Sequence, residues 1–290
     1  MTRSTPSATI AAGCPPGLAA ALEARSATIA TAIPDPPRTY VVADSPQGRL
    51  FAWYTSSARD EPVLEHELAV REAIGSNGAL RTPAILAHGP GWRLEPALES
   101  DPLEGPDAVS RAVTAAEELA SRTLPQLDLR RFGRAAGARF ATLRRRALMA
   151  RSPLPLRDTV AARRIVESSE LPPATSHGDF HSGHIFVSGD EGAWVIDWEM
   201  VAPRPAGWDL LYLWADLDRP EDRDLVFTAA LGVVGEARRA QLQRLHYAAV
   251  VRMIAAKVAE PNPLYRDPNG AQRLMAELPR LREAAAGRDR

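Results

Sequence analysis

A short β-hairpin, predicted within an otherwise helical stretch, is the feature that most constrains how this 290-residue chain can fold. Its two apolar runs, 184–187 and 193–196, are joined by turn-forming residues at 188–192. Acidic residues flank the hairpin, with Asp179 before the first run and Asp197 after the second. Because a tight hairpin brings its two ends together, the carboxylates can converge on one site although 18 positions (197 − 179) separate them.

The sequence around this hairpin divides into a β-rich part and a helical part. Two strand-like runs, 39–43 and 49–55, enclose a Pro/Gly turn, and a helical segment extends from Pro62 to Ile74. Further short strands are expected at 83–86 and 92–94. After residue 102, apolar residues recur at helical spacing. Helices are expected at 113–120, 132–149, 208–215, 226–231 and 241–258.

These patterns predict an α+β fold with two lobes. A partly flexible extension at 1–36, with a short helix near 17–25, precedes a small β-rich N-lobe at 37–100. A larger, mostly helical C-lobe at 101–290 contains the hairpin and its two carboxylates. At 290 residues the chain is long enough for each lobe to bury a core.

Composition excludes several classes of protein. Apolar residues make up 45% and charged residues 24% of the chain, which is typical of a soluble globular protein. A formal net charge of −1 gives no long-range attraction to nucleic acid or to an acidic membrane, so neither partner is expected. We find no apolar run long enough to span a bilayer and no signal-peptide pattern in the first 12 residues. A single cysteine, Cys14, excludes an intramolecular disulfide and fits a reducing cytoplasm.

The basic residues are almost all arginine. Among 35 basic residues only Lys257 is a lysine, so any mechanism that needs a lysine has one candidate. The densest basic run is Arg144, Arg145 and Arg146, which we interpret as the solvated face of a helix.

Two segments around the hairpin carry a resemblance to a known family. Residues 176–187 read Ser-His-Gly-Asp-Phe-His-Ser-Gly-His-Ile-Phe-Val, and residues 195–199 read Val-Ile-Asp-Trp-Glu. The first resembles the catalytic loop of the aminoglycoside phosphotransferase and choline kinase family, and the second resembles the family's metal-binding Asp. Gly-Trp-Asp-Leu at 207–210 is similar to a structural Gly-x-x-Asp-Leu segment of these proteins. The resemblance covers about residues 38–260 and implies a bilobal, protein-kinase-like fold.

The resemblance implies a role for each residue of these segments. Asp179 would accept or orient the proton of an acceptor hydroxyl, and His177 would brace its loop by hydrogen bonding. Asp197 and His184 would hold Mg²⁺, which bridges the phosphates of ATP or GTP. His181 and Glu199 would contact the acceptor or support the site, and Asp209 would have a structural role.

The N-terminal half departs from the family pattern. The strand lysine that grips the α- and β-phosphates is replaced, because Trp53 falls at or beside its position. Glu67 is the best match for the helix Glu that pairs with this lysine, and Arg49 lies on the same strand face as Trp53. Residues 31–37 contain prolines and no glycine where a glycine-rich phosphate-covering loop is expected. Glu95 and Leu98, at the start of the connector between the lobes, complete the predicted nucleotide-binding residues.

His184 is a departure in the catalytic half. The family usually has Asn at this position, whose neutral oxygen suits Mg²⁺ better than an imidazole nitrogen does. The macrolide phosphotransferases also carry His there, as the resemblance implies. A zinc site is an alternative, because His177, His181 and His184 lie within eight residues. Intervening glycines oppose a helix that would align these histidines, and no cysteine is near, so we favour the phosphotransferase interpretation.

Two functional interpretations follow. In the favoured one, the chain is an active kinase that phosphorylates a hydroxyl of a small molecule or natural product. In the other, it is a degenerate relative that binds a ligand, a peptide or a partner enzyme without phosphate transfer. The acceptor would bind between roughly 105–160 and 210–280. Because the segment 130–164 is strongly basic, we expect a neutral or acidic acceptor, such as a macrolide-like or nucleoside natural product or a Ser/Thr hydroxyl on a peptide, rather than an aminoglycoside.

Overall fold

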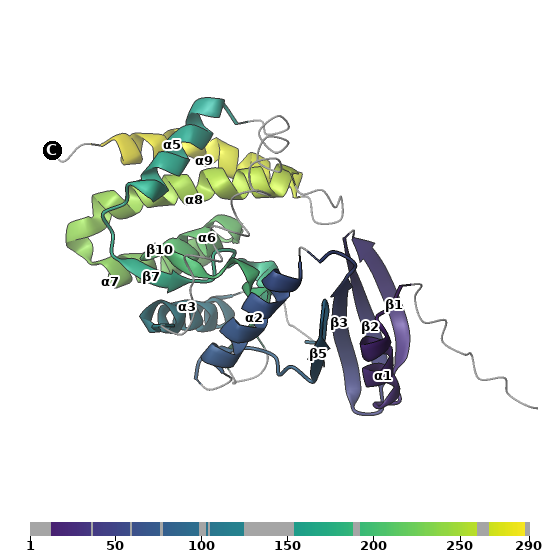
Figure 1. Ribbon diagram of the computed structural model, residues 1–290. Helices are drawn as coiled ribbons and strands as arrows, with labels where there is room; N and C mark the ends of the chain where they lie inside the picture. The colour runs from purple at the N-terminus through teal and green to yellow at the C-terminus, as the bar shows by residue number, and fades with distance from the viewer. Residues whose placement is uncertain are drawn as a thin grey trace, which may run out of the picture. The chain divides into compact units, whose positions relative to one another are not determined.

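The protein forms two compact units. A computed structural model describes residues 13–35, 37–58, 60–75, 78–98, 103, 105–124, 154–187, 192–259 and 267–287. Unit 1 comprises the chain up to residue 69 together with 82–99, and unit 2 comprises 70–81 and the chain from residue 100 onward. Many of their elements are labelled in Figure 1.

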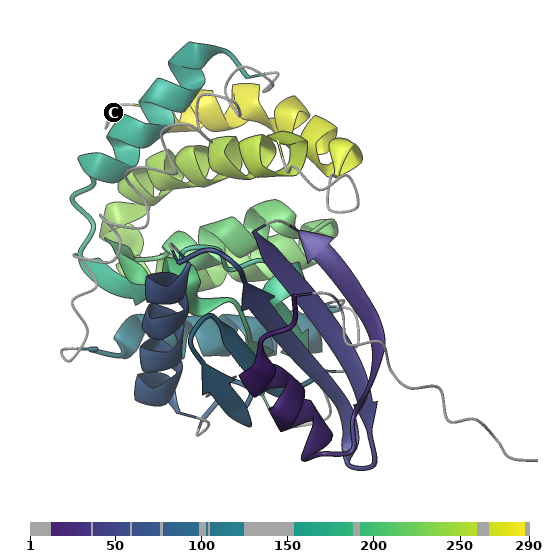
Figure 2. The ribbon, with the colours of Figure 1, turned by 45° about the vertical axis from the view of Figure 1, so that its right-hand side comes forward.

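Unit 1 is a five-stranded antiparallel sheet with one helix against it. The strands follow the order β1-β2-β3-β6-β5. The elements are α1 (Pro16–Glu23), β1 (Thr28–Asp35), β2 (Arg38–Ser45), β3 (Gly48–Thr55), β5 (Ala87–Gly89) and β6 (Trp92–Pro96). Figure 2 shows α1 lying against this sheet. Helix α2 (Glu61–Ile74) begins in unit 1 and ends in unit 2.

The two faces of this sheet carry different side chains, because successive residues of a strand point to opposite sides. Apolar residues of β2, β3 and β6, such as Ala52 and Leu94, pack with Leu18 and Leu22 of α1 in one core. On the opposite face, Trp53 of β3 pairs with Arg93 of β6. The first face therefore supplies the core of unit 1, and the second face places polar groups beside a tryptophan.

Strand β1 lies where the sequence suggested an extension. Thr28–Asp35 pairs with β2 from the Thr28–Asp44 pair to the Asp35–Arg38 pair. The strand is at the edge of the sheet, where Pro34, which has no N–H to donate, is tolerated. None of its residues is fully buried, so its hydrophobic alternation is weak and a strand is hard to predict there from the sequence. The sheet thus begins at residue 28 rather than near 37.

A second difference concerns the strand expected at 83–86. The structure has strands on either side of it instead, β4 (Leu80–Arg81) and β5. Pro83 interrupts the run, since it cannot donate to a ladder. Strand β4 pairs with β9, and bonding to β6 begins at Leu86, whose N–H donates to the carbonyl of Leu94 at 2.9 Å.

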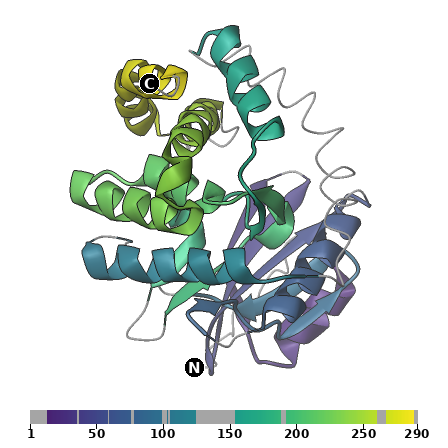
Figure 3. The same cartoon turned by 90° about the vertical axis from the view of Figure 1, so that its left-hand side faces the viewer.

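Unit 2 is mainly helical. Its helices are α3 (Pro106–Ser121), the last part of α2, α5 (Leu156–Glu167), α6 (Trp208–Asp216), α7 (Pro220–Val234), α8 (Arg239–Ala259) and α9 (Pro268–Ala286). Helices α8 and α9 run side by side, and α3 lies alongside α7 (Figure 3). The predicted helix at 132–149 and the arginines at 144–146 lie outside the described residues.

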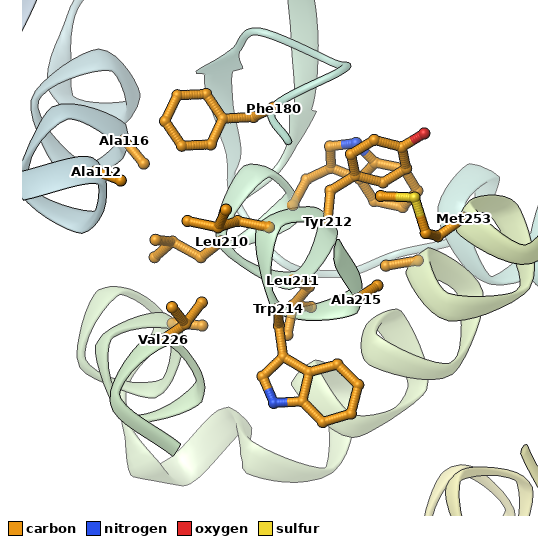
Figure 4. Packing of buried hydrophobic residues seen from close by; sticks show 14 of the residues in the cluster. Ala112, Ala116, Phe180, Leu210, Leu211, Tyr212, Trp214, Ala215, Val226 and Met253 are labelled. Carbon is orange, nitrogen blue, oxygen red and sulfur yellow. The ribbon is translucent and has the colours of Figure 1, made fainter. Parts of the chain in front are cut away.

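Helix α6 is the centre of unit 2. All residues from Trp208 to Ala215 are buried, so the helix is covered on every side. Figure 4 shows residues of α6 between α3, α7 and α8. Phe180, from the loop that follows residue 176, is directed towards Ala112 and Ala116 of α3. A helix enclosed in this way provides a rigid support for whatever contacts it.

The predicted hairpin is present in unit 2. Strands β8 (Ile185–Val187) and β9 (Ala193–Val195) are antiparallel, and β4 pairs with β9 in parallel. The expected turn at 188–192 lies outside the described residues except for Gly192. A separate two-stranded sheet consists of β7 (Pro173–Ser176) and β10 (Ala202–Pro205). Three single-turn 3-10 helices complete the unit: η1 (Ser182–His184), η2 (Trp198–Met200) and η3 (Glu236–Arg238).

The predicted fold class is confirmed: a β-sheet region precedes a helical region in an α+β fold. Within the described part of the chain, none of the helices has the length and apolar character needed to cross a membrane.

His246 provides a test of packing around α6. It is buried on α8, its ring 4.1 Å from that of Trp214 on α6 and 5.4 Å from that of Phe227 on α7. Burial, assisted by the charges of Arg280 and Arg223, lowers the pKa of His246 to about 3. The folded state therefore keeps this imidazole neutral at pH values where an unfolded chain protonates it.

We expect the free energy of unfolding to fall as the pH drops from 6.5 towards 3, because only the unfolded state takes up this proton. By pH 5 the loss from His246 alone is about 2 kcal/mol. In His246→Phe this component is removed, so urea titrations of variant and wild type should diverge below pH 6.5 by that amount. Parallel pH profiles for the two proteins would contradict the assignment.

Candidate active site

The loop that follows β7 is held by one buried carboxylate of α6. Asp209 accepts hydrogen bonds from the Ser176 hydroxyl at 2.7 Å, the His177 backbone N–H at 2.7 Å and the Gly178 backbone N–H at 3.0 Å. Charged acceptors make the stronger hydrogen bonds. Three such bonds to consecutive residues fix the path of the chain into Asp179.

Gly178 is required at its position in this loop. Its φ of +84° lies in the left-handed region, which residues other than glycine rarely adopt. A Cβ atom there would lie 2.6 Å from the carbonyl oxygen of Met200 and 2.6 Å from the Arg204 guanidinium. The loop can therefore pass close to Arg204 only because residue 178 has no side chain.

His177 lies fully buried beneath the loop, as the bracing role predicted for it requires. Its Nε2 is 2.9 Å from the carbonyl oxygen of Ile196, and its ring lies edge-on to Trp198 with centroids 4.8 Å apart. A carbonyl only accepts, so Nε2 carries the hydrogen. Burial and the neighbouring His184 lower the pKa of His177, which keeps the ring neutral. The imidazole thereby links the Asp179 loop to the end of the hairpin.

Asp179 is ionised in this environment. Burial acts to raise its pKa, but the electrostatic influence of the nearby His181, His184 and Arg252 outweighs burial and holds the pKa below its usual value. The Tyr212 hydroxyl donates to the carboxylate and accepts from Arg252. Burial and the charge of Asp179 raise the pKa of Tyr212, so this hydroxyl keeps its proton.

Both imidazoles beside Asp179 present N–H groups towards it. His184 Nδ1 is 2.9 Å from the Asp179 backbone carbonyl and must donate to it. His181 Nδ1 accepts from the Gly183 N–H at 3.1 Å, so the hydrogen of the neutral ring is on Nε2, 3.9 Å from Asp179 Oδ2. Burial and the proximity of His184 lower the pKa of His181 to about 4.

These tautomers decide between two uses of the cluster. Asp179, His181 and His184 bring potential ligand atoms within 4.8 Å of one another, a spacing that could hold a metal ion. A metal ligand, however, needs a free lone pair on the nitrogen that faces the ion. His181 Nε2 carries a hydrogen on the side of Asp179, and His184 donates its Nδ1 hydrogen to the Asp179 carbonyl, so in these tautomers the two imidazoles support Asp179 rather than share a metal ion with it.

His184 and Asp197 form a second pair, which does fit a divalent cation. His184 Nε2 is 3.4 Å from Asp197 Oδ2. Burial acts to lower the pKa of His184, but Asp197 and Asp179 outweigh it and raise the pKa. Because Nδ1 donates to the Asp179 carbonyl, a neutral His184 directs the lone pair of Nε2 at the carboxylate, where a cation can take the place of a proton. The donor set is one nitrogen and one oxygen.

Asp197 itself adopts an unusual backbone conformation. Its φ of 62° and ψ of 60° are left-handed, a region that Asp visits more readily than most residues. The turn directs the chain out of β9 into η2, where Glu199 is half-buried. The backbone thus bends at the residue whose side chain faces His184.

The predicted nucleotide-binding residues lie in unit 1 and form a different arrangement from the one expected. Glu67 of α2 forms a buried ion pair with Arg93, which also lies 3.5 Å from Glu95. The Arg93 guanidinium is 5.2 Å from the centre of the Trp53 ring, a cation–π contact. The cation that pairs with the helix Glu therefore comes from β6, one strand away from the β3 position that Trp53 occupies.

The other two residues predicted for this side are placed apart from that pair. Arg49, at the start of β3, is 55% exposed and bonds to Asp44 of β2 at 3.1 Å. Leu98 is half-buried just after β6. Neither shows a contact with Glu67, so Arg93 and not Arg49 is the arginine that this structure brings to the helix Glu.

Comparison with known proteins identifies the family of this chain. The family model described as the phosphotransferase enzyme family matches residues 35–242. The chain belongs to this family. No significant match was found among curated protein sequences.

Solved structures show the same fold as this phosphotransferase. An ethanolamine kinase from Plasmodium vivax has a TM-score of 0.61 at 13% identity, covering 89% of this chain and 84% of that one. An aminoglycoside phosphotransferase in complex with ADP and hygromycin B has a TM-score of 0.57 at 11% identity, covering 92% and 98%. A macrolide 2′-phosphotransferase from Brachybacterium faecium has a TM-score of 0.51 at 13% identity, covering 94% and 98%. At these identities the likeness concerns the fold alone.

One face of α6 contacts the loop of this phosphotransferase; sequence reasoning predicted Asp209 on this face as a structural residue but missed Tyr212 and Asp216. Asp209, Tyr212 and Asp216 are spaced i, i+3 and i+7, so they share a helix face. Asp209 contacts residues 176–178, Tyr212 contacts Asp179, and Asp216 contacts Ser182. The spacing was visible in the sequence, but the packing of that face against the loop was not.

Replacing the Asp209 carboxylate tests its role. In Asp209→Asn one accepting oxygen becomes an N–H₂ group that faces a donor of the loop. We expect the free energy of unfolding to fall by about 2–4 kcal/mol, the cost of leaving buried donors unpaired. Chemical denaturation measures it, with the exposed Asp224→Asn on α7 as control, expected to change stability by less than about 0.5 kcal/mol. Equal stability of the two variants would contradict this role.

Proposed function

We propose that this phosphotransferase transfers a phosphate group from ATP or GTP to a hydroxyl of a small molecule. The observation that carries the proposal is an ionised Asp179, whose carboxylate accepts from Tyr212 and lies beside His181 and His184, next to a His184–Asp197 pair that fits a cation. Phosphoryl transfer asks little covalent chemistry of the protein beyond alignment and charge neutralisation. Both requirements are met by the same short loop and hairpin.

In this proposal the residues of unit 2 have separate roles. Asp179 orients the acceptor hydroxyl and accepts its proton as the hydroxyl oxygen bonds to the γ-phosphorus, while the bond from that phosphorus to the departing nucleoside diphosphate breaks. His184 and Asp197 would hold Mg²⁺, which when bound neutralises the phosphates of the donor. His177 and Asp209 fix the loop, and His181 and Glu199 stay predictions for the acceptor side.

The acceptor is proposed to be neutral or acidic. The arginines Arg204 and Arg252 lie near Tyr212 and Asp179, and burial lowers the pKa of Arg204 to about 10 with Arg252 as the next cause. These two cations beside Asp179 would repel a positively charged polyamine acceptor. A macrolide-like compound, a nucleoside natural product and a Ser/Thr peptide are therefore the acceptor classes to test first, with an aminoglycoside as the expected negative.

Nucleotide binding and the two carboxylates provide the test. We expect Mg²⁺ with ATP or GTP to stabilise the protein by about 2.7 kcal/mol at a concentration 100 times Kd, measured by thermal denaturation. Asp197→Asn should abolish the part of this effect that requires metal. Asp179→Asn should retain it but reduce transfer to an accepted substrate by about 10²–10⁴-fold.

Three outcomes would contradict the proposal. Absence of any nucleotide effect at millimolar concentration would favour the degenerate, ligand-binding alternative, which Trp53 at the strand lysine position supports. Full turnover in Asp179→Asn would remove Asp179 as the base. Unchanged metal dependence in Asp197→Asn would exclude it as a ligand.

For the nucleotide side we propose that Arg93, paired with Glu67 and stacked near Trp53, supplies the positive charge that the strand lysine would have supplied. Arg93→Met should weaken ATP or GTP binding at least about tenfold, whereas Arg49→Met should leave it unchanged. Calorimetric titration measures both, and Arg93→Lys, which keeps a cation, should bind with intermediate affinity. Weaker binding in Arg49→Met and not in Arg93→Met would reverse the assignment. Circular dichroism confirms that each variant is folded.

A further inference from the structure

The only lysine of the chain lies between two carboxylates of unit 2. Lys257 of α8 places its Nζ 2.8 Å from Asp216 Oδ1 and 2.8 Å from Asp267 Oδ2. Its side chain is 11% exposed and that of Asp216 is 9% exposed. Asp267 in turn caps the first turn of α9 by accepting from the Gly270 N–H at 2.8 Å. One ammonium group thus joins the end of α6, the end of α8 and the start of α9.

A lysine meets a geometric requirement at this position. An ammonium is a compact charge with three donors on one nitrogen, so two carboxylates can approach the same atom. A guanidinium is larger and planar and holds its five donors in a fixed plane, so in the space that an ammonium fills we expect it to displace one of the two carboxylates. In a chain whose other 34 basic residues are arginine, the lysine stands where two carboxylates converge on one nitrogen.

The second oxygen of Asp216 holds the catalytic loop. Asp216 Oδ2 accepts from the Ser182 N–H at 2.8 Å and from the Ser182 hydroxyl. Burial acts to raise the pKa of Asp216, but the charge of Lys257 outweighs it, with His181 adding to the effect, and the pKa is lowered to about 2. A charged Asp216 is therefore available to Ser182 throughout the neutral pH range.

Ser182 begins the turn that orients both imidazoles. The turn η1 spans Ser182–His184, and the residue that caps it is His181, whose Nδ1 accepts from the Gly183 N–H. The His184 N–H donates to the His181 carbonyl at 2.9 Å. The two rings lie 4.0 Å apart between centroids. Displacement of Ser182 would therefore displace both N–H groups that face Asp179.

We propose that Lys257 is a positioning residue for the proposed phosphotransferase reaction. It holds Asp216 against Ser182, and through this turn it keeps His181 and His184 in place beside Asp179. Lys257 touches neither the reacting groups nor the loop itself. This inference rests on the proposed function for its effect on catalysis, whereas its effect on the loop does not depend on that function.

The structural test measures amide hydrogen exchange in the full chain. We expect Lys257→Met to speed exchange of the Ser182, Gly183 and His184 amides on the order of tenfold, the equivalent of one hydrogen bond to a charged group. Exchange in α7, for example at 226–234, should stay unchanged. Lys257→Gln provides a second neutral variant if Lys257→Met does not fold, and Lys257→Arg should not restore slow exchange.

Two comparisons separate positioning from general stabilisation. Arg273→Met removes another ion pair between α9 and the chain after α6, the one with Asp218, but leaves Ser182 untouched, so its η1 amides should exchange as in wild type. In an Asp216→Asn background, Lys257→Met should add no further increase at Ser182, because the link is already broken. Faster exchange throughout unit 2, unchanged exchange at Ser182, or wild-type behaviour of Lys257→Arg would each overturn the proposal.

The catalytic test measures the intrinsic hydrolysis of Mg²⁺–ATP, or transfer to whichever of the acceptor classes named under Proposed function proves to be a substrate. Lys257→Met should lower kcat about tenfold while KM for the nucleotide stays the same, and Arg273→Met should change neither. If no nucleotide turnover is found in wild type, the proposed function fails while the exchange result still decides whether Lys257 holds the loop. Equal kcat in wild type and Lys257→Met, with an active enzyme, would overturn the catalytic part of the proposal.

Discussion

The buried carboxylate of Asp209 is the interaction on which the site depends. Three donors from consecutive residues converge on it, so the backbone from Ser176 to Gly178 has one path. That path sets Asp179 beside Tyr212 and places His177 beneath the loop, where it reaches Ile196 after the hairpin. Because α6 is buried on every side, Asp209 is held by a helix of the close-packed core and not by a surface segment.

Charge neutralisation explains how so many acidic groups coexist in one small region. Each carboxylate has its own compensation: backbone and hydroxyl donors for Asp209, Tyr212 and nearby cations for Asp179, and Lys257 for Asp216. Asp197 faces an imidazole whose pKa is raised, which is the electrostatic condition for exchanging a proton for a metal ion. In the proposed function a cation would lie between His184 and Asp197, and Tyr212 donates a hydrogen bond to Asp179.

In unit 1, strand pairing brings a positive charge to Glu67 from a neighbouring strand instead of from the strand where it was expected. Trp53 fills the place expected for a lysine, yet Arg93 stands directly opposite it on the next strand and forms the ion pair with Glu67. Residues paired across antiparallel strands share a face, so a side chain one strand away can reach the same partner. A scan along the sequence considers only the strand itself, which is why Arg49 was predicted and Arg93 was not.

By itself the sequence determined the family, the α+β class and the local elements with strong periodicity, including α2, the β2–β3 hairpin and the β8–β9 hairpin. It also predicted Asp179, Asp197 and His177 as site residues, because they lie in two short motifs of contiguous residues. Only the tertiary structure decided which hydrogen each imidazole carries, which arginine meets Glu67, and that Asp209, Tyr212 and Asp216 form one face against the loop. The physical reason is that these contacts depend on how separate segments pack: Glu67 and Arg93 are 26 positions apart, and Asp209 is 31 to 33 positions from its donors in the loop. Motifs and periodicity, by contrast, are properties of neighbouring residues.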